Sequence, residues 1–392
     1  MEKTSPTAAI VFLPREGDNP CLMLEPILFD PAALWLRETL SRAGVERCLV
    51  ACHRDDRERA QQCFPQDTVF VTTGEENAQE ELHTFLRATG RVIVVTEPVF
   101  LLSGAADRLR EGQTQSEGQI PCGVYELSED CREQTLNGGD FVTSLPTTCV
   151  PYSGLAMGVS RESLATDLPA AAKAQSVRRL QKRGVRFVDP QNVYIGPQAK
   201  VGAGTVILPG TILRGETWIG ARCEIGPNAV LKDVTVGEDS TVNASQCYQC
   251  TIGSGTTVGP FAYIRPDTQV GDKVRVGDFV ELKNSVIGDE TRISHLAYLG
   301  DCDVGEGSDI GCGTVTVNYD GVKKFRTRIG AGAFIGCNTN LVAPVTVGQG
   351  AYIAAGSTIT RDVPSQSLAI ARSQQTVKNQ WVKRRQAKQE KK

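Results

Sequence analysis

A single histidine is the best candidate for acid–base chemistry in the second half of this chain. His295 is the only histidine after His83, and it stands in the stretch ISHLAYLGD among aliphatic residues and glycines. The unperturbed pKa of imidazole lies near neutrality, so a histidine can take a proton from an amine under physiological conditions. The residue fits either a partly buried structural position or the general base of a transfer reaction.

Two cations stand beside aliphatic residues of the same region. Arg265 follows Ile264, and Lys283 follows Leu282, each one residue beyond a repeat position. The guanidinium fork of arginine can bond two oxygens of a phosphate at once. One such charge alone is typical of a solvated surface, but a purely structural solenoid would rarely place such cations.

An irregular segment, NYDGVKKFRT at 318–327, follows the histidine. It leaves the six-residue period of its surroundings between Val315 and Ile329, so we expect a loop there. An excursion of this kind from a rigid scaffold is typical of a lid, or of an arm that reaches a neighbouring subunit.

The scaffold that must position these residues is set by a repeat of period six. A helix would need a period near 3.6 and a simple strand a period of 2, so neither explains it. Period six predicts a left-handed parallel β-helix with three short strands in each coil, and its flat faces predict a homotrimer; a monomeric structural solenoid is the alternative. The repeated aliphatic residues are Ile195, Val201, Ile207, Leu213, Ile219, Ile225 and Leu231; Ile252, Val258, Ile264, Val270, Val276 and Leu282; and Ile329, Ile335, Leu341, Val347, Ile353 and Ile359.

The front of the chain has a different pattern. Short apolar runs alternate with helical segments, which predicts a parallel α/β sheet with helices on its faces. A connecting helix is expected at 168–184, stopped by Gly184. The predicted strands are 8–13, 47–52, 67–73 and 91–97, and the predicted helices between them are 30–44 and 76–90.

Composition restricts the class of protein. Of 392 residues, 42 are Lys or Arg and 45 are Asp or Glu, so the charge predicts no nucleic-acid partner. We expect a cytoplasmic protein without a membrane segment, because neither a signal peptide nor a long apolar run is evident. The 13 cysteines are then reduced core residues. Cys247 and Cys250 have zinc-like spacing but no second ligand pair, so we predict no metal.

The motifs of the β-helix resemble a known family. PFAYIRPDTQVGDKVRVGDFVELKNSVIG, SHLAYLGD, TVNYDGVKKFRT and NTNLVAPVTVG are similar to the bifunctional bacterial enzyme of UDP-N-acetylglucosamine synthesis. That family joins an N-acetylglucosamine-1-phosphate uridylyltransferase to a glucosamine-1-phosphate N-acetyltransferase. The resemblance covers about residues 189–375 and implies an acetyltransferase that takes its acyl group from acetyl-CoA.

The resemblance also implies roles for individual residues. His295 matches the general base of the family. The residues matching the sugar-phosphate site are Arg265, Lys283, Tyr298, Asp309, Asn318 and Lys324. The residues matching the acetyl-CoA site are Cys312, Asn318, Tyr319, Cys337, Ala355 and Arg372, and the last of these would meet the 3′-phosphate end of the cofactor.

Three of these positions depart from the family pattern. Cys312 replaces an alanine and Cys337 a serine, and both changes are nearly isosteric. Asp309 replaces an asparagine, which removes a donor and adds negative charge near an anionic substrate.

The N-terminal half matches the family poorly. The glycine-rich basic loop that cradles a nucleotide triphosphate is replaced by VFLPREGDNP, in which Pro14 lacks an N–H donor and Glu16 adds negative charge. Glu97 is the only nearby candidate for the magnesium-binding acid. We therefore expect a degenerate, nucleotidyltransferase-like (Rossmann-like) domain without uridylyltransferase activity, with Mg²⁺ needed only if that domain were active.

The leading hypothesis is an acetyltransferase with domains at 1–167 (α/β), 168–188 (linking helix), 189–375 (β-helix) and 376–392 (basic tail). A fully bifunctional enzyme and a noncatalytic regulatory solenoid are the alternatives. A zinc-dependent carbonic anhydrase of this fold is rejected, because it needs several histidines per site. The tail is either a solvated terminus or a cover over the acyl-donor channel.

Overall fold

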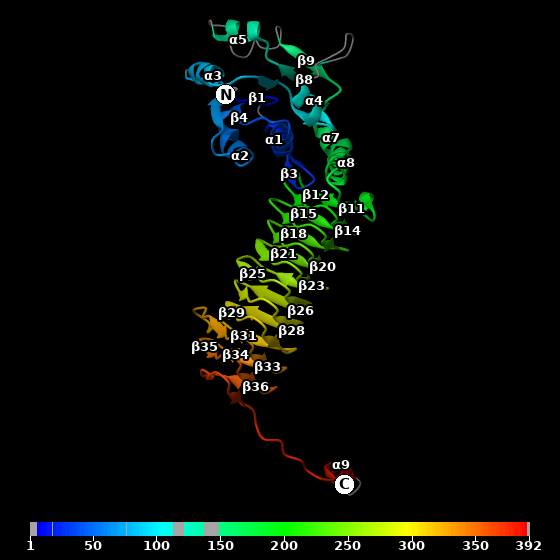
Figure 1. Ribbon diagram of the computed structural model, residues 1–392, viewed down its shortest axis with the longest axis vertical. Helices are drawn as coiled ribbons and strands as arrows, with labels where there is room; N and C mark the ends of the chain where they lie inside the picture. The colour runs from blue at the N-terminus through cyan, green and yellow to red at the C-terminus, as the bar shows by residue number, and fades with distance from the viewer. Residues whose placement is uncertain (1–5, 18, 76, 113–120, 137–148, 390–392) are drawn as a thin grey trace. The chain divides into compact units, whose positions relative to one another are not determined.

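The computed structural model describes residues 6–17, 19–75, 77–112, 121–136 and 149–389 (Figure 1). It forms two compact units, a first unit of Met1–Asp239 and a second unit of Ser240–Lys392.

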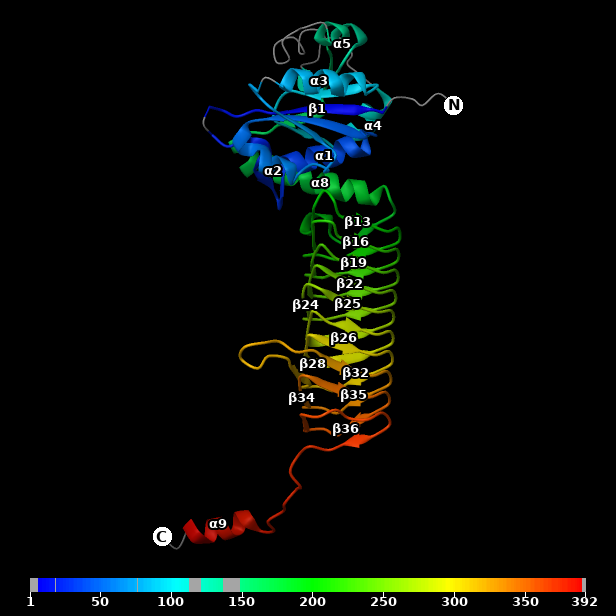
Figure 2. The same ribbon diagram turned by 90° about the vertical axis from the view of Figure 1, so that its left-hand side faces the viewer.

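The α/β part of the first unit is built on a sheet of strand order β5-β4-β1-β6-β8-β9. β1, β4, β5 and β6 pair in parallel, as their continuous apolar sequences predict. Helices α1 and α3 cover opposite faces of this sheet (Figure 2). The strands are β1 (Ala8–Leu13), β4 (Arg47–Cys52), β5 (Val69–Thr72), β6 (Val92–Val95), β8 (Pro121–Glu126) and β9 (Val150–Ser153).

The remaining elements of the α/β part and its link to the β-helix are helices, two small strand pairs and short 3-10 turns. The helices are α1 (Ala32–Arg42), α2 (Arg57–Gln61), α3 (Ala78–Arg87), α4 (Ala105–Glu111), α5 (Glu129–Leu136), α7 (Arg161–Ala165) and α8 (Asp167–Gln181). Small strand pairs are formed by β2 (Pro26–Ile27) with β3 (Asp30–Pro31), and by β7 (Val99–Leu101) with β10 (Ala156–Gly158). Short 3-10 turns lie at Leu22–Leu24, Arg54–Asp56 and Pro190–Asn192.

Two antiparallel strands, β8 and β9, extend the sheet and correct the expectation of a purely parallel one. A polar network joins them to the parallel core. Arg91 donates to both carboxylate oxygens of Glu126 at 2.8 and 2.7 Å, and the buried Tyr152 hydroxyl donates to Glu126 at 2.6 Å. These contacts join residues far apart in sequence, which is why local patterns did not predict them.

The linking helix is confirmed as α8, which begins at Asp167 and ends at Gln181, shortly before Gly184. Gly184 has a φ of 84°, a left-handed conformation that favours glycine after a helix. The Ser176 hydroxyl donates to the carbonyl of Ile195 at 2.8 Å. The helix is thereby joined to the first coil of the β-helix within the first unit.

Both units contain coils of a left-handed parallel β-helix, as the period of six predicts. Every aliphatic residue of the three repeat series is buried, with an exposed fraction of 5% or less. Stacking of these side chains between coils supplies the apolar core that each coil lacks alone. In the first unit the strands are β11 (Arg186–Phe187), β12 (Tyr194–Ile195), β13 (Lys200–Val201), β14 (Val206–Ile207), β15 (Ile212–Arg214), β16 (Trp218–Ile219), β17 (Glu224–Ile225), β18 (Val230–Lys232) and β19 (Thr235–Val236).

The second unit contains the motif-rich coils. Cys247 and Cys250 are buried in their interior. The strands are β20 (Thr241–Val242), β21 (Gln246–Tyr248), β22 (Cys250–Ile252), β23 (Thr257–Val258), β24 (Tyr263–Ile264), β25 (Thr268–Val270), β26 (Arg275–Lys283), β27 (Val286–Ile287), β28 (Arg292–Gly300), β29 (Cys302–Val304), β30 (Asp309–Ile310), β31 (Val315–Val317), β32 (Thr327–Ile329), β33 (Phe334–Ile335), β34 (Asn340–Val342), β35 (Val345–Val347), β36 (Tyr352–Ile353), β37 (Thr358–Ile359) and β38 (Leu368–Ala369).

The basic tail contains a helix, α9 (Trp381–Gln389), that the sequence analysis did not predict. Two Lys, two Arg, two Gln and one Ala, all good helix formers, make up most of the helix, and it contains neither Gly nor Pro. Residues 390–392 of the predicted tail lie outside the described residues. Nowhere in the described part of the chain is a helix both long and apolar enough to span a bilayer.

Candidate active site

The site is organised by two long strands that run through a corner of the β-helix. β26 and β28 each contain nine residues, whereas most strands of the solenoid contain two or three. They bend at Phe279 and Leu296, whose φ angles are 57° and 37°. Positive φ is unfavourable for such side chains, so the bend is imposed by the coil rather than by local preference.

His295 lies just before this corner and faces a carboxylate. The register of β26 and β28 pairs it with Asp278, and His295 Nδ1 lies 2.5 Å from Asp278 Oδ1. The hydrogen bond to His295 is the largest of the effects that together lower the pKa of Asp278. An ionised carboxylate accepts the Nδ1 proton, which leaves Nε2 of the half-exposed ring free to accept a proton from a substrate.

The predicted cofactor residues continue from His295 along the same corner. Strand registers on both sides of it place Cys312, Cys337 and Ala355 in successive coils after His295. Arg372 follows in the next coil, next to Gly356. Adjacent strands are about 4.8 Å apart, so the line from His295 to Ala355 is about 14 Å long. Such a line suits an extended ligand with its reacting end at the histidine.

A cluster of cations lies just past the corner, on the next face. Arg265 and Lys283 occupy matching positions one residue after the paired Ile264 and Leu282, as the sequence predicts. Arg265 donates to Glu281 at 2.8 Å. Lys324 approaches Lys283, and the hydrogen bond between the two side chains, followed by the repulsion of their like charges, lowers the pKa of Lys324. Two neighbouring ammonium groups form an environment that an anion would stabilise.

Asp301 holds the polar residues behind this cluster. It accepts hydrogen bonds from Asn284 Nδ2 at 2.6 Å and from Asn318 Nδ2 at 2.5 Å. Burial acts to raise the pKa of Asp301, but these hydrogen bonds and the nearby lysines lower it overall. Asn318 is buried, and the hydrogen bond to Asp301 gives its side-chain amide one partner within the chain.

Tyr298 is placed by the absence of a side chain at Gly300. A Cβ atom at Gly300 would collide with the Tyr298 hydroxyl and with the amide of Asn318. The glycine therefore allows the phenol and the amide to share the space beside Asp301.

The predicted loop is confirmed as a hairpin-like excursion between β31 and β32. Tyr319 pairs with Lys324 in an antiparallel bridge, and the Phe325 amide donates to the Asn318 carbonyl at 2.8 Å. Figure 2 shows the loop projecting from the coils near β28 and β32. Its position carries Lys324 back toward Lys283, while the Tyr319 ring is exposed.

Asp309 is placed in β30, in register with Arg292 and Phe334, on the face before the corner. Among the described residues of one chain, no hydrogen bond or ion pair joins Asp309 to Arg265, Lys283 or Lys324. The other predicted residues fall into two groups, the line that begins at His295 and the cation cluster.

Sequence reasoning missed Asp278, Asp301 and Gly300. Each lies inside a quoted motif, so the signal was present, but only strand pairing shows what each one touches. The described residues contain no group of three or more His, Cys, Asp or Glu side chains that could hold a metal.

An exposed apolar ridge marks the corner itself. Phe261, Phe279 and Leu296 are each more than half exposed, and the rings of Phe261 and Phe279 stack with centroids 5.7 Å apart. Large apolar side chains in a continuous exposed row are typical of an interface with another protein surface.

Comparison with known proteins places the match on the β-helix. A family model described as bacterial transferase hexapeptide (six repeats) matches residues 249–284 and 326–361. The bifunctional protein GlmU of Clostridium acetobutylicum is 54% identical over 201 residues, which are 51% of this chain and 44% of that protein. The bifunctional protein GlmU of Clostridium botulinum (strain Kyoto / Type A2) is 45% identical over 260 residues, 66% of this chain and 56% of that protein.

The chain thus spans about half the length of the curated relatives it matches. The resemblance to the bifunctional family that the motifs predict is confirmed over this part. Among solved structures, an Arabidopsis UDP-N-acetylglucosamine acyltransferase is 18% identical, with a TM-score of 0.28 over 52% of this chain and 75% of that chain. A match at this score carries no weight for function.

Proposed function

We propose that the protein transfers the acetyl group of acetyl-CoA to the amine of glucosamine-1-phosphate, on the route to UDP-N-acetylglucosamine. The observation that carries this proposal is the line of His295, Cys312, Cys337 and Ala355 beside the cluster of Arg265, Lys283 and Lys324. An extended acyl donor and a small anionic acceptor would meet at the histidine. The similarity to bifunctional GlmU proteins favours the same pair of substrates.

The chemistry follows from the geometry at His295. Nε2 takes a proton from the substrate ammonium group, and the free amine attacks the thioester carbonyl. A C–N bond forms, the C–S bond breaks, and the departing thiolate of coenzyme A takes up the proton that the new amide nitrogen loses. Asp278 stabilises the imidazolium that forms on the way, since it lies 2.5 Å from Nδ1.

The acyl donor would lie along the corner. Ala355 and the exposed Cys337 leave room for a chain to pass, because their side chains are small. Arg372 at the far end would bind the 3′-phosphate of coenzyme A, and Asn318 and Tyr319 would contact the reacting end from the loop.

The sugar phosphate would bind past the corner. Arg265, Lys283 and Lys324 supply positive charge for the phosphate, and Tyr298 and Asn318 supply hydrogen-bonding groups for the hydroxyls. Asp309 is the departure that bears on substrate choice. Its carboxylate cannot donate as the family asparagine does, and it would repel an anion placed close to it.

A homotrimer would complete the site. The exposed ridge of Phe261, Phe279 and Leu296 needs a covering surface, and a second copy of the flat-faced solenoid can supply one. The exposed tip of the loop 318–327 would then reach a neighbouring subunit, while Asn318 and Lys324 stay beside Asp301 and Lys283 of their own chain.

We further propose that the α/β domain has lost uridylyl transfer. The first loop offers Arg15, but its Nε atom lies 2.5 Å from the buried Asp56 carboxylate. No lysine occurs in the sequence between Lys3 and Lys173. A nucleoside triphosphate at this loop would therefore compete with Asp56 for Arg15 and would find no lysine from this domain's later segments.

One coupled measurement tests both parts. Release of coenzyme A from acetyl-CoA and glucosamine-1-phosphate is followed beside pyrophosphate release from UTP and N-acetylglucosamine-1-phosphate. We expect the first activity and not the second. Pyrophosphate release above a no-protein control would restore the bifunctional alternative, and the absence of both activities would favour a noncatalytic solenoid.

A further inference from the structure

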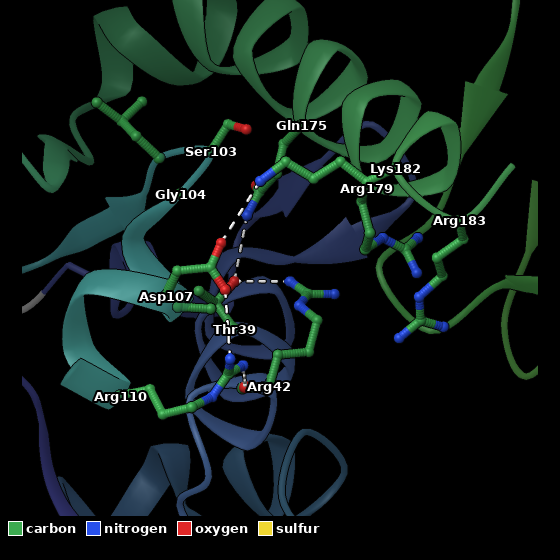
Figure 3. Close-up of a pocket in the computed structure, with 12 residues that line it drawn as sticks. Thr39, Arg42, Ser103, Gly104, Asp107, Arg110, Gln175, Arg179, Lys182 and Arg183 are labelled. Atoms are coloured by element: carbon green, nitrogen blue, oxygen red, sulfur yellow. Dashed lines mark hydrogen bonds and ion pairs between the residues drawn. The ribbon is translucent and has the colours of Figure 1, made fainter.

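A second candidate site lies in the first unit, and none of its residues has a role assigned above. An open pocket of about 280 Å³ is lined by residues of the last turn of α1, of α4 and the segment before it, and of α8 and the two residues after it. Its charged lining consists of five cations and one acid: Arg42, Arg110, Arg179, Lys182, Arg183 and Asp107. Figure 3 shows Lys182 and Arg110 reaching toward Asp107, with Arg42, Arg179 and Arg183 on the side away from it.

The acids near this pocket do not balance its positive charge. Asp107 is shared between Arg110 and Lys182, at 3.4 Å from each. Glu38 also acts on Arg42 and Arg179, but its carboxylate lies 2.9 Å from Arg37.

As a result, the neighbouring cations destabilise one another's charged forms. Burial, and then the charges of Arg42 and Arg183, lower the pKa of Arg179 to about 9. Burial also lowers the pKa of Arg42. An excess of positive charge held this close together is stabilised by a bound anion.

A buried polar atom without a partner marks the same pocket. Gln175 is only 6% exposed, and its Nε2 atom donates to the Thr39 hydroxyl at 3.2 Å. Its Oε1 atom has no hydrogen-bond partner. Buried acceptors without partners are rare in folded proteins, because they lose their hydrogen bonds to water. A ligand hydroxyl or N–H group would satisfy this atom.

The pocket differs from the place where α/β sheets usually hold ligands. Such sheets bind nucleotides at the carboxyl ends of their strands. Arg42 ends α1 only five residues before β4 begins, so the pocket lies toward the amino ends instead. The degenerate nucleotide loop therefore says nothing about this site.

We propose that this pocket binds a small phosphate ester that carries hydroxyl groups, such as a monosaccharide phosphate. The phosphate would lie among Arg42, Arg110, Lys182 and Arg183, and a hydroxyl would donate to Gln175 Oε1. A volume of about 280 Å³ has room for a single sugar ring with its phosphate. Because Arg179 lies in α8 and Lys182 and Arg183 directly follow it, the ligand would bind the end of α8 to α1 and α4 and reduce its local opening.

The test is hydrogen exchange of the α8 amides in the full chain, with and without glucose 6-phosphate. The pocket variant is Lys182→Gln/Arg183→Gln, and the control is Arg178→Gln, which removes an exposed charge from the same helix without touching the pocket. We expect the ligand to slow exchange in α8 of the wild type and the control, and to require an at least tenfold higher concentration in the pocket variant. A site in the β-helix is common to all three proteins, so it cannot produce this difference.

Further arms separate the chemical classes. Glucose should not slow hydrogen exchange in α8, and neither should potassium chloride at the ionic strength of the glucose 6-phosphate solution. Inorganic phosphate should slow it only at a higher concentration than glucose 6-phosphate does. Gln175→Leu should abolish the preference for glucose 6-phosphate over inorganic phosphate. The site would be ruled out if glucose 6-phosphate slowed α8 exchange equally in the pocket variant and the control, or if potassium chloride slowed it as much. The hydroxyl contact with Gln175 would be ruled out if inorganic phosphate slowed wild-type exchange at the same concentration as glucose 6-phosphate.

Discussion

The first loop of the α/β domain and the His295 corner of the β-helix use their charges in opposite ways. In the loop, Arg15 is joined to Asp56, a carboxylate whose side chain is only 3% exposed. At the corner, Lys283 and Lys324 approach each other, and this contact lowers the pKa of Lys324. The charge of Arg15 is thus balanced within the chain, whereas the two like charges beside the corner leave a place for an anionic ligand.

The same contrast separates two hydrogen-bonded carboxylates. Glu126 is bound by Arg91 and by the buried Tyr152 hydroxyl, so its bonds join strands of the sheet. The Asp278 carboxylate is instead bound to a half-exposed histidine that keeps its second nitrogen available. We therefore expect substitutions in the first group to change stability and substitutions in the second to change rate.

The largest effect is expected for His295→Ala. A positioned base is worth about 10²- to 10⁴-fold in rate, so kcat for acetyl transfer should fall by about that factor. The KM values and the mass measured by light scattering should stay unchanged. Retention of near-full kcat at neutral pH would make His295 a structural residue.

A smaller loss is expected for Asp278→Asn. The amide cannot stabilise the imidazolium as a carboxylate does, so kcat should fall by about tenfold, with KM unchanged. The loss stays below that of His295→Ala, because water partly replaces an exposed carboxylate. Steady-state rates of both single variants and of the double variant test this. Independent, multiplicative losses would show that Asp278 does not act through His295.

Arg265→Ala should mainly raise the KM for glucosamine-1-phosphate, by about tenfold, because it binds a group present in both ground and transition states. The matched control is Lys273→Ala. Lys273 is an exposed cation of the same unit, and its Nζ atom lies 3.6 Å from Oε1 of Glu290. Initial rates at varied sugar-phosphate concentration should distinguish the two. Equal KM values would remove Arg265 from the phosphate site.

The smallest effect on activity is expected for Glu126→Gln. Loss of the charge-assisted bonds to Arg91 should lower the free energy of unfolding by about 1–3 kcal/mol and leave acetyl transfer unchanged. The hydrogen bond from Arg91 is the main cause of a lowered pKa for Glu126. Its stabilising effect is therefore present above the ordinary carboxyl pKa and is lost as pH falls through the lowered value.

Chemical denaturation at neutral and at acidic pH tests this linkage. The difference in stability between wild type and Glu126→Gln should shrink as the solution is acidified. A difference that stays constant across this range would show that the charge of Glu126 is not what joins the strands.

The sequence alone determined the architecture of the β-helix. Each coil buries one aliphatic side chain per face, so the period of six is a local signal repeated many times, and every predicted inward residue is buried. The parallel strands and α8 were also predictable, because continuous apolar runs and a helix ended by Gly184 are local patterns. The antiparallel strands β8 and β9 and the helix α9 were not predicted.

Tertiary structure alone decided which functional residues are neighbours. Cys312 and Cys337 are 25 positions apart because the 318–327 loop lengthens one coil, yet strand register places them side by side. The pairing of Asp278 with His295, and the gathering of cations around Gln175 from α1, α4 and α8, depend on contacts between distant segments. Sequence spacing cannot report such contacts, because coil length and helix packing, rather than the local pattern, set which side chains meet.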